Sequence, residues 1–301
     1  MDINVITIQA FEKWLTTLGY APSTIYGSMR YVTDFFFYLK LAEITTIEQI
    51  TPAILNDYHH HLQKRKNKRQ NGSLSTNYIT ANINALKRFS RYLQQSGQHF
   101  FEVGIKTRPR KDTGKTILSP AEIQSLYKAC SNDMLGIRDR AMLSVYYGCG
   151  LRRSEGISLD VKDVLPDQKR LYVRKGKNYR ERYVPMTTAV QQDLENYIHV
   201  SRKYLQSFKP QKDEALFISL QSRRMSGNAL IGRLHKLQQI AGIHKETCAE
   251  PGRSIGLHTL RHSIATHLLQ SGMTLEEVSR FLGHSSLEST QIYTHIANAE
   301  L

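Results

Sequence analysis

Long apolar runs and paired cysteines are both missing from this chain of 301 residues. No run reaches the roughly 18 apolar residues of a membrane span, and the N-terminus lacks the basic and apolar segments of a signal peptide. The cysteines, Cys130, Cys149 and Cys248, lie far apart and include no CxxC pair, which argues against a disulfide framework or a zinc site. We therefore expect a cytoplasmic protein with no membrane segment and no bound metal.

Acidic residues are scarce relative to basic ones. The chain has 26 Asp and Glu residues against 41 Lys and Arg residues, which gives a formal net charge of +15. Such an excess favours a polyanionic partner, most simply a nucleic acid, over the alternative of a basic surface that binds nothing. The hydrophobic content of 40% is ordinary for a globular protein, and the length is sufficient for two domains with a core each.

Signals for the start of a helix recur through residues 1–103 and predict an N-terminal domain of several short helices. Ser23, Thr51 and Ser75 are each suited to cap a helix, and Pro52 suits the first helical position after Thr51. The aromatic run 35–37 could stack on bases, but packing in the core is favoured because duplex DNA exposes few base faces. The helix after Ser75 should carry basic side chains on its outer face: Lys87, Arg88 and Arg91.

Residues 104–117 interrupt this pattern and are predicted to be a basic interdomain linker, because they have no apolar period. The linker could run along DNA phosphates or simply be solvated. Residues 118–301 should form a second domain, starting at the helix cap Ser119 before Pro120. This domain is predicted to be mostly helical with a small sheet, with strands at 169–174 and 182–185 and helices at 187–206 and 226–242.

Residues 258–293 gather side chains that could cut a phosphodiester bond. Tyrosine can act as a nucleophile, but its pKa near 10 in water means that it needs help at neutral pH. Guanidinium groups suit phosphate oxygens because they make paired hydrogen bonds and keep their charge. His258 and Arg261 are three positions apart and so share one face of a predicted helix, and Tyr293 follows His284 by nine residues.

Local signals indicate how the chain presents these side chains. Thr274 and Glu277 have the spacing of a capping box for a second helix. Gly283 stands where a left-handed glycine ends a helix, and it places the next residue at the mouth of the turn. A third short helix, starting at about residue 287, should carry Tyr293 near its C-terminal end.

Five elements in order resemble the tyrosine recombinases of the phage-integrase family, and most closely their Xer-like branch. The pattern consists of GLRxSE, a GKG-type lysine hairpin, HxLRH, LGH and then a tyrosine. Here it covers Gly150–Glu155, the lysines of the hairpin after residue 174, and residues 258–293. The resemblance implies an N-terminal helical core-binding domain of the SAM-like type, followed by a tyrosine-recombinase catalytic domain.

The same resemblance implies the reaction and its residues. Tyrosine would attack DNA to form a 3′-phosphotyrosine, without metal or cofactor, and the subunits would act as a homotetramer on two specific duplex sites while being monomers or weak dimers when free. Lys175 remains an alternative to Lys177 as the general acid, and Glu155 would support a catalytic neighbour. The catalytic residues carried over are Arg152, Lys177, His258, Arg261, His284 and Tyr293.

Two other functions use the same features. A type IB topoisomerase shares the chemistry, although the Xer-like spacing and the compact chain argue against it. A non-catalytic DNA-binding regulator on this fold would have no need of the complete residue set. The sequence does not specify the DNA site, nor whether the reaction serves dimer resolution, integration, excision or inversion in a mobile element.

Overall fold

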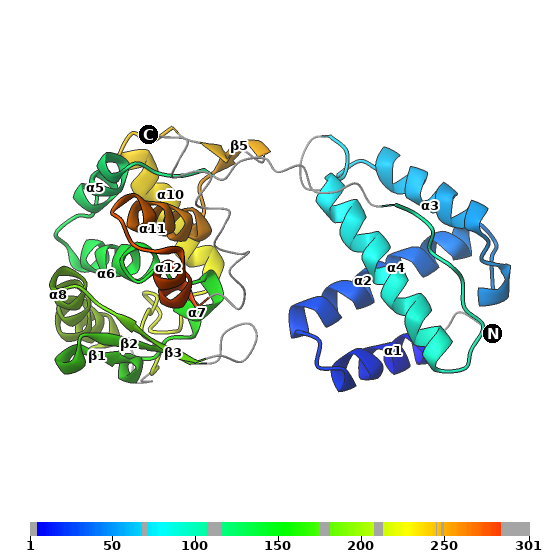
Figure 1. Ribbon diagram of the computed structural model, residues 1–301, viewed down its shortest axis with the longest axis horizontal. Helices are drawn as coiled ribbons and strands as arrows, with labels where there is room; N and C mark the ends of the chain where they lie inside the picture. Colours follow the sequence, from blue (N-terminus) through cyan, green and yellow to red (C-terminus); the bar gives the residue numbers. More distant parts are fainter. Residues whose placement is uncertain are drawn as a thin grey trace. The chain divides into compact units, whose positions relative to one another are not determined.

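The computed structural model describes residues 5–67, 72–106, 116–174, 181–207, 213–244, 246–247 and 250–283. The chain divides into two compact units, Met1–Asp112 and Thr113–Leu301 (Figure 1). Both units are mostly helical, as predicted. The predicted limits of the linker at 104 and 117 stay a prediction, because residues 107–115 lie outside the described residues.

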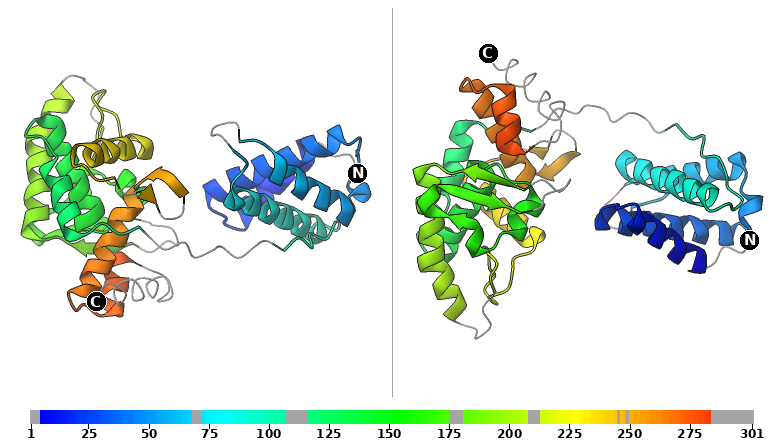
Figure 2. Two further views of the ribbon diagram at one scale, coloured as in Figure 1. Left: turned by 90° about the horizontal axis from the view of Figure 1, so that it is seen from above. Right: turned by 60° about the horizontal axis from the view of Figure 1, so that its bottom comes forward.

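The first unit is a small helical module. In it α4 packs against α1, α2 and α3 (Figures 1 and 2). Its elements are α1 (Val5–Thr17), α2 (Pro22–Leu41), the 3₁₀ turn η1 (Ile47–Gln49), α3 (Pro52–Lys64) and α4 (Thr76–Gln95). An aromatic core holds them together, in which the rings of Phe11 and Phe89 meet edge to face with centroids 5.2 Å apart.

Two of the three predicted helix caps in this unit are confirmed. Thr51 Oγ1 accepts a hydrogen bond from the Ile54 N–H at 3.4 Å, and Ser75 Oγ accepts one from the Tyr78 N–H at 3.2 Å. The prediction for Ser23 is wrong, because α2 already begins at Pro22. A proline in the first turn has no N–H to satisfy, so this helix starts without a side-chain cap.

The aromatic run 35–37 and the basic face of α4 follow the predictions only in part. Phe35 and Phe36 are buried in the core, whereas Phe37 is 63% exposed. Lys87 and Arg91 are exposed, as expected of an outer face. Arg88 is instead half-buried, and its Nε donates to Ser28 Oγ at 3.1 Å. A long arginine stem can cover apolar surface in this way, which position along the helix does not reveal.

The second unit combines a larger set of helices with two small sheets. Its first helices are α5 (Pro120–Lys128), α6 (Met134–Leu143) and α7 (Arg153–Ser158), with a π-helical turn η2 (Ser144–Gly148) between the last two. After the first sheet come α8 (Thr188–Asn196), the π-helical η5 (Tyr197–Arg202), α9 (Lys203–Ser207), α10 (Gly227–Ile240), α11 (Leu257–Gln270) and α12 (Leu275–Leu282).

A three-stranded antiparallel sheet in the order β1-β2-β3 lies at one side of this unit (Figure 2). It contains β1 (Val164–Leu165), β2 (Arg170–Val173) and β3 (Arg182–Pro185), with 3₁₀ turns η3 (Val161–Asp163) and η4 (Pro166–Gln168) beside β1. The register pairs Val173 with Arg182, so β2 and β3 form the predicted hairpin. The pair β4 (Glu246–Thr247) and β5 (Glu250–Ser254) was not predicted, because these short segments lack an apolar alternation.

Helix α6 and turn η2 run through the core of the second unit, and α11 packs against η2. Met142, Val145 and Tyr146 are almost completely buried there. Turn η2 ends at Gly148, and Cys149 and Leu151 are still fully buried in the same core before α7 begins at Arg153. The segment 150–155 is therefore fixed against α11 by the core itself.

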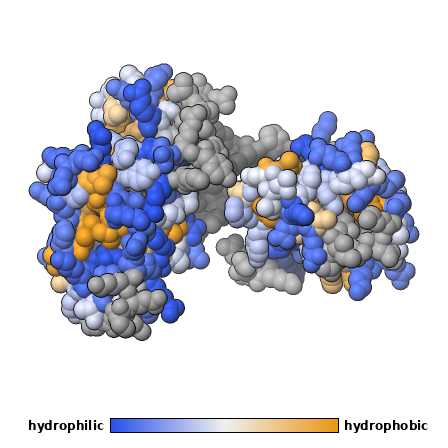
Figure 3. All heavy atoms as spheres, turned by 90° about the horizontal axis from the view of Figure 1, so that it is seen from below, coloured by the Kyte–Doolittle hydropathy of each residue, from blue (hydrophilic) through white to orange (hydrophobic). Residues whose placement is uncertain are grey.

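Apolar side chains also reach the surface of this unit. Figure 3 shows them gathered on one face amid hydrophilic residues. A groove of about 960 Å³ is lined by Tyr127, Tyr147, Val190, Leu268 and Phe281, among others. None of the helices in the described part of the chain is both long and apolar enough to cross a bilayer.

Candidate active site

Three of the six predicted catalytic residues belong to the described part of the chain, and all three lie in the second unit: Arg152, His258 and Arg261. The other three lie outside the described residues, as does the alternative lysine: Lys177, His284, Tyr293 and Lys175. The roles of all of these residues stay predictions.

Arg152 lies at the N-terminus of α7 with an extended backbone. Its backbone N–H donates to Glu155 Oε2 at 2.8 Å, and its Nη1 donates to Glu155 Oε1 at 2.9 Å. Its Nη2 donates to the carbonyl oxygen of Gly283 at 3.0 Å. Glu155 and the end of α12 thus fix the guanidinium at two points.

Arg261 lies on α11 and its side chain is only 3% exposed. Its Nη1 donates to the carbonyl oxygen of Gly150 at 2.6 Å, and its Nη2 donates to that of Leu282 at 2.8 Å. Burying a guanidinium is costly unless such partners satisfy it. Arg261 therefore joins the segment before α7 to the end of α12.

Glu155 lies at the centre of a cluster of arginine side chains. One of these, Arg182 on β3, was not identified from the sequence. Arg182 donates from Nη1 to Glu155 Oε1 and from Nη2 to Glu155 Oε2, both at 3.0 Å. Arg261 Nη1 lies 3.8 Å from Glu155 Oε2. Burial alone would raise the pKa of Glu155, but the hydrogen bonds and charge of Arg182 and the hydrogen bonds of Arg152 lower it to about 2. The carboxylate is therefore ionised at all ordinary pH values.

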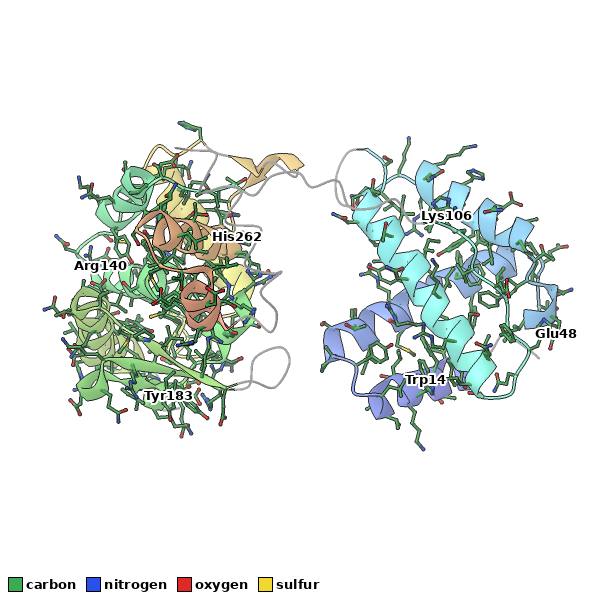
Figure 4. The ribbon with its side chains drawn as sticks, in the orientation of Figure 1. Trp14, Glu48, Lys106, Arg140, Tyr183 and His262 are labelled. Carbon is green, nitrogen blue, oxygen red and sulfur yellow. The ribbon has the colours of Figure 1, made fainter. Side chains whose placement is uncertain are left out.

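His258 lies in the first turn of α11, where part of the residue is open to solvent while neighbouring groups displace water from much of the ring. Loss of water around the ring lowers the pKa of His258, and the positive charges of Arg261, Arg152 and Arg153 lower it further. Both effects favour the neutral form of the imidazole, which can accept a proton. His262 follows one turn later on the same helix, where Figure 4 labels it.

The end of α12 has the predicted construction. Thr274 and Glu277 form the capping box at its start, with Thr274 N–H donating to Glu277 Oε2 at 2.9 Å. Gly283 ends the helix in the left-handed conformation, with φ of +65°. A Cβ added to Gly283 would lie 2.7 Å from Cδ and Nε of Arg182. Three arginines thus contact the two residues that precede His284.

Chemically, the cluster can bind a phosphate. Three guanidiniums, those of Arg152, Arg182 and Arg261, surround one carboxylate, that of Glu155, so the formal charge is 3 − 1 = +2. A neutral imidazole lies on the same helix as Arg261. A positive, partly buried site next to a proton acceptor suits a reaction that develops negative charge on phosphate oxygens.

Comparisons with known proteins agree with this chemistry. The model of the phage integrase family matches residues 116–300. Tyrosine recombinase XerD of Oceanobacillus iheyensis is 33% identical over 287 residues, which cover 94% of this chain and 91% of the relative. The crystal structure of XerA recombinase is 26% identical, with a TM-score of 0.53 over 98% of this chain and 95% of that one. The XerH recombinase bound to its difH substrate shares the fold, with a TM-score of 0.69, 20% identity and coverage of 92% and 77%.

The chain therefore belongs to the phage integrase family. Within that family it is a tyrosine-type site-specific DNA recombinase of the Xer-like branch, as the sequence predicted. The predicted combination of a mostly helical fold with a small sheet is confirmed as well.

Proposed function

We propose that Arg152, Arg261 and His258 act on the scissile phosphate together with Lys177, His284 and Tyr293. The observation that carries this assignment is the shared Glu155, which holds Arg152 directly and lies 3.8 Å from Arg261. Two arginines far apart in the sequence are thereby brought to one carboxylate. A fixed pair of guanidiniums can bind both non-bridging oxygens of a phosphodiester.

In the proposed cleavage step, the Tyr293 oxygen attacks the phosphorus atom and the bond from phosphorus to the 5′ oxygen breaks. A 3′-phosphotyrosine forms, and the DNA keeps a free 5′ hydroxyl. Neutral His258 accepts the phenol proton, while Lys177 gives a proton to the departing 5′ oxygen. Lys175 is the alternative donor. Rejoining is the reverse of these transfers. It needs no external energy source, because the 3′-phosphotyrosine is itself a phosphodiester.

We propose that no metal ion takes part. The charge that a metal would supply to the phosphate oxygens is present in Arg152 and Arg261, whose guanidiniums stay protonated at any relevant pH. His284 would add a hydrogen bond to the same phosphate. The support for this view is the net positive charge of the described cluster.

The first unit is proposed to be the core-binding domain, residues 1–103, with 104–117 as linker and 118–301 as catalytic domain. Exposed Lys87 and Arg91 on α4 support contacts with the DNA backbone. Each phosphate contact releases counterions and makes binding depend on salt.

Because each chain carries one proposed nucleophile and exchange between two duplexes breaks four strands, we propose a homotetramer on two sites. Because the substrate is the cell's DNA, we propose that the protein acts in the cytoplasm.

The experiment that tests this function begins with Tyr293→Phe, which should retain binding because one oxygen is removed. DNA that this variant protects in the host genome gives the recombination site. A nicked duplex carrying that site then traps the covalent intermediate of the unaltered protein, which a denaturing gel resolves. An adduct formed equally by Tyr293→Phe would show that another residue is the nucleophile.

A further inference from the structure

Arg182 occupies a special place in the hairpin. It pairs with Val173 as the first residue of β3, directly after the connection 174–181. That connection contains both candidate lysines, Lys175 and Lys177. Contacts that hold Arg182 in place therefore also hold one end of the segment that carries the proposed general acid.

The side chain of Arg182 points away from solvent and toward Glu155. It is 13% exposed, while the Glu155 side chain is 1% exposed. Both terminal nitrogens donate to the two carboxylate oxygens at 3.0 Å, which is the bidentate geometry that orients both partners. Arg152 donates to the same carboxylate from its side chain and its backbone.

Arg182 also lies against the end of α12. A Cβ on Gly283 would approach its Cδ and Nε to 2.7 Å, so the arginine stem uses the space that the glycine leaves open. One residue of the strand that follows the lysines therefore contacts both the residue before His284 and the carboxylate that holds Arg152.

We propose that Arg182 is a positioning residue for recombination, which neutralises Glu155 so that Arg152 and Arg261 keep their charge available to the phosphate. This role rests on the function proposed above. As the tyrosine oxygen attacks, negative charge builds up on the phosphate oxygens, and the net positive charge of the cluster stabilises it. Without Arg182 the cluster falls to +1, and a buried carboxylate competes with the phosphate for Arg152.

This role differs from that of a purely structural ion pair. Arg140 and Asp193 form such a pair in the same unit, with Nε to Oδ1 at 2.6 Å. Arg140 is 47% exposed and contacts neither Glu155 nor the end of α12 by any interaction between described residues. Arg140→Gln is therefore the matched control, since it also removes an arginine from a carboxylate.

The test measures three quantities for each variant: the melting temperature, the dissociation constant for the nicked site, and the single-turnover rate of adduct formation at saturating protein. Arg182→Gln should slow adduct formation by roughly tenfold to 100-fold, as expected when catalytic groups are misplaced by up to about 1 Å. Arg140→Gln should cleave at the rate of the unaltered protein.

The double variant Arg182→Gln with Glu155→Gln gives the decisive comparison. It removes one positive and one negative charge, restores +2, and allows an amide pair in place of the ion pair. It should cleave faster than Arg182→Gln but more slowly than the unaltered protein, because an amide at position 155 has one acceptor oxygen where the carboxylate bonds Arg152 with two. A double variant no faster than Arg182→Gln would overturn the proposed charge compensation, because loss of packing alone is not repaired by a second substitution.

Other outcomes are equally informative. If the unaltered protein forms no adduct, the proposed function fails and the role of Arg182 fails with it. If it forms the adduct and Arg182→Gln keeps the same rate, only the role of Arg182 is overturned. Should Arg182→Gln not fold, Arg182→Lys replaces it. Slower adduct formation at an unchanged melting temperature then supports positioning, and an unchanged rate contradicts it.

Discussion

Replacing Gly283 by alanine should slow catalysis as well as lower stability. The backbone of Gly283 has φ of +65°, which costs an L-residue roughly 1–2 kcal/mol. For a unit of this size, that loss should lower the melting temperature by about 2–8 °C. The added Cβ would also lie 2.7 Å from Arg182, whereas ordinary contact begins at 3.4 Å.

The steric conflict sets the expected loss of rate. The Cβ and the arginine stem must separate by 3.4 − 2.7 = 0.7 Å, and the residue that moves is bonded to His284 and holds Arg152 through its carbonyl oxygen. A shift of about 1 Å in a catalytic group can cost on the order of 100-fold in rate. We therefore expect adduct formation to slow by roughly tenfold to 100-fold at saturating protein.

Gly242 provides the matched control for this substitution. It has the same φ of +65°, but a Cβ there would meet no described atom within 4 Å. Gly242→Ala should therefore lose the same roughly 1–2 kcal/mol of stability and keep the cleavage rate. Thermal unfolding and single-turnover trapping of both variants make the comparison. Equal rates for the two would refute the view that the contact of Arg182 with Gly283 matters to catalysis.

Three further predictions concern the proton transfers and the charge of the site. The pKa of His258 is lowered, so its neutral form is lost only as the pH falls through that lowered value, and the rate of cleavage should decline there. Because the charge of Arg153 contributes to the lowering, Arg153→Gln should raise the pKa and move this decline to higher pH. Adduct formation should survive EDTA, and loss of activity that magnesium restores would contradict a metal-free step. Lys177→Ala, but not Lys175→Ala, should be rescued by a 5′-bridging phosphorothiolate, whose sulfur leaves without a proton; the reverse result would exchange their roles.

The sequence predicted those parts of the fold that neighbouring residues determine. Thr274 and Glu277 are three positions apart, and a capping box needs nothing else. The predicted cap Ser119 is confirmed for the same reason, because its Oγ accepts a hydrogen bond from the N–H of Glu122 at 3.2 Å. The prediction for Ser23 was wrong because α2 begins at Pro22, which is also a favourable residue for the start of a helix. Local sequence rules do not decide which of two adjacent start signals is used.

Contacts between distant segments were not predictable in the same way. Arg182 is one basic residue among many, and a strand arginine at a hairpin is usually solvated. Its importance follows only when β3 and α7 are packed together, which places it on Glu155, 27 residues away in the sequence. The reverse happened with Arg88. It was predicted to lie on the exposed outer face of α4, but its side chain is half-buried and donates a hydrogen bond to Ser28.

The way in which the arginines are held bears on how the site can bind a phosphate at all. A guanidinium has five N–H donors, and the side-chain bonds of Arg152 to Glu155 and Gly283 use two of them. The protein therefore fixes the orientation of this group while donors remain for phosphate oxygens. Because a prepositioned donor need not reorganise during the reaction, more of its interaction is available to the transition state. Weakening the anchors around Glu155 should accordingly reduce the rate of cleavage more than the affinity for DNA.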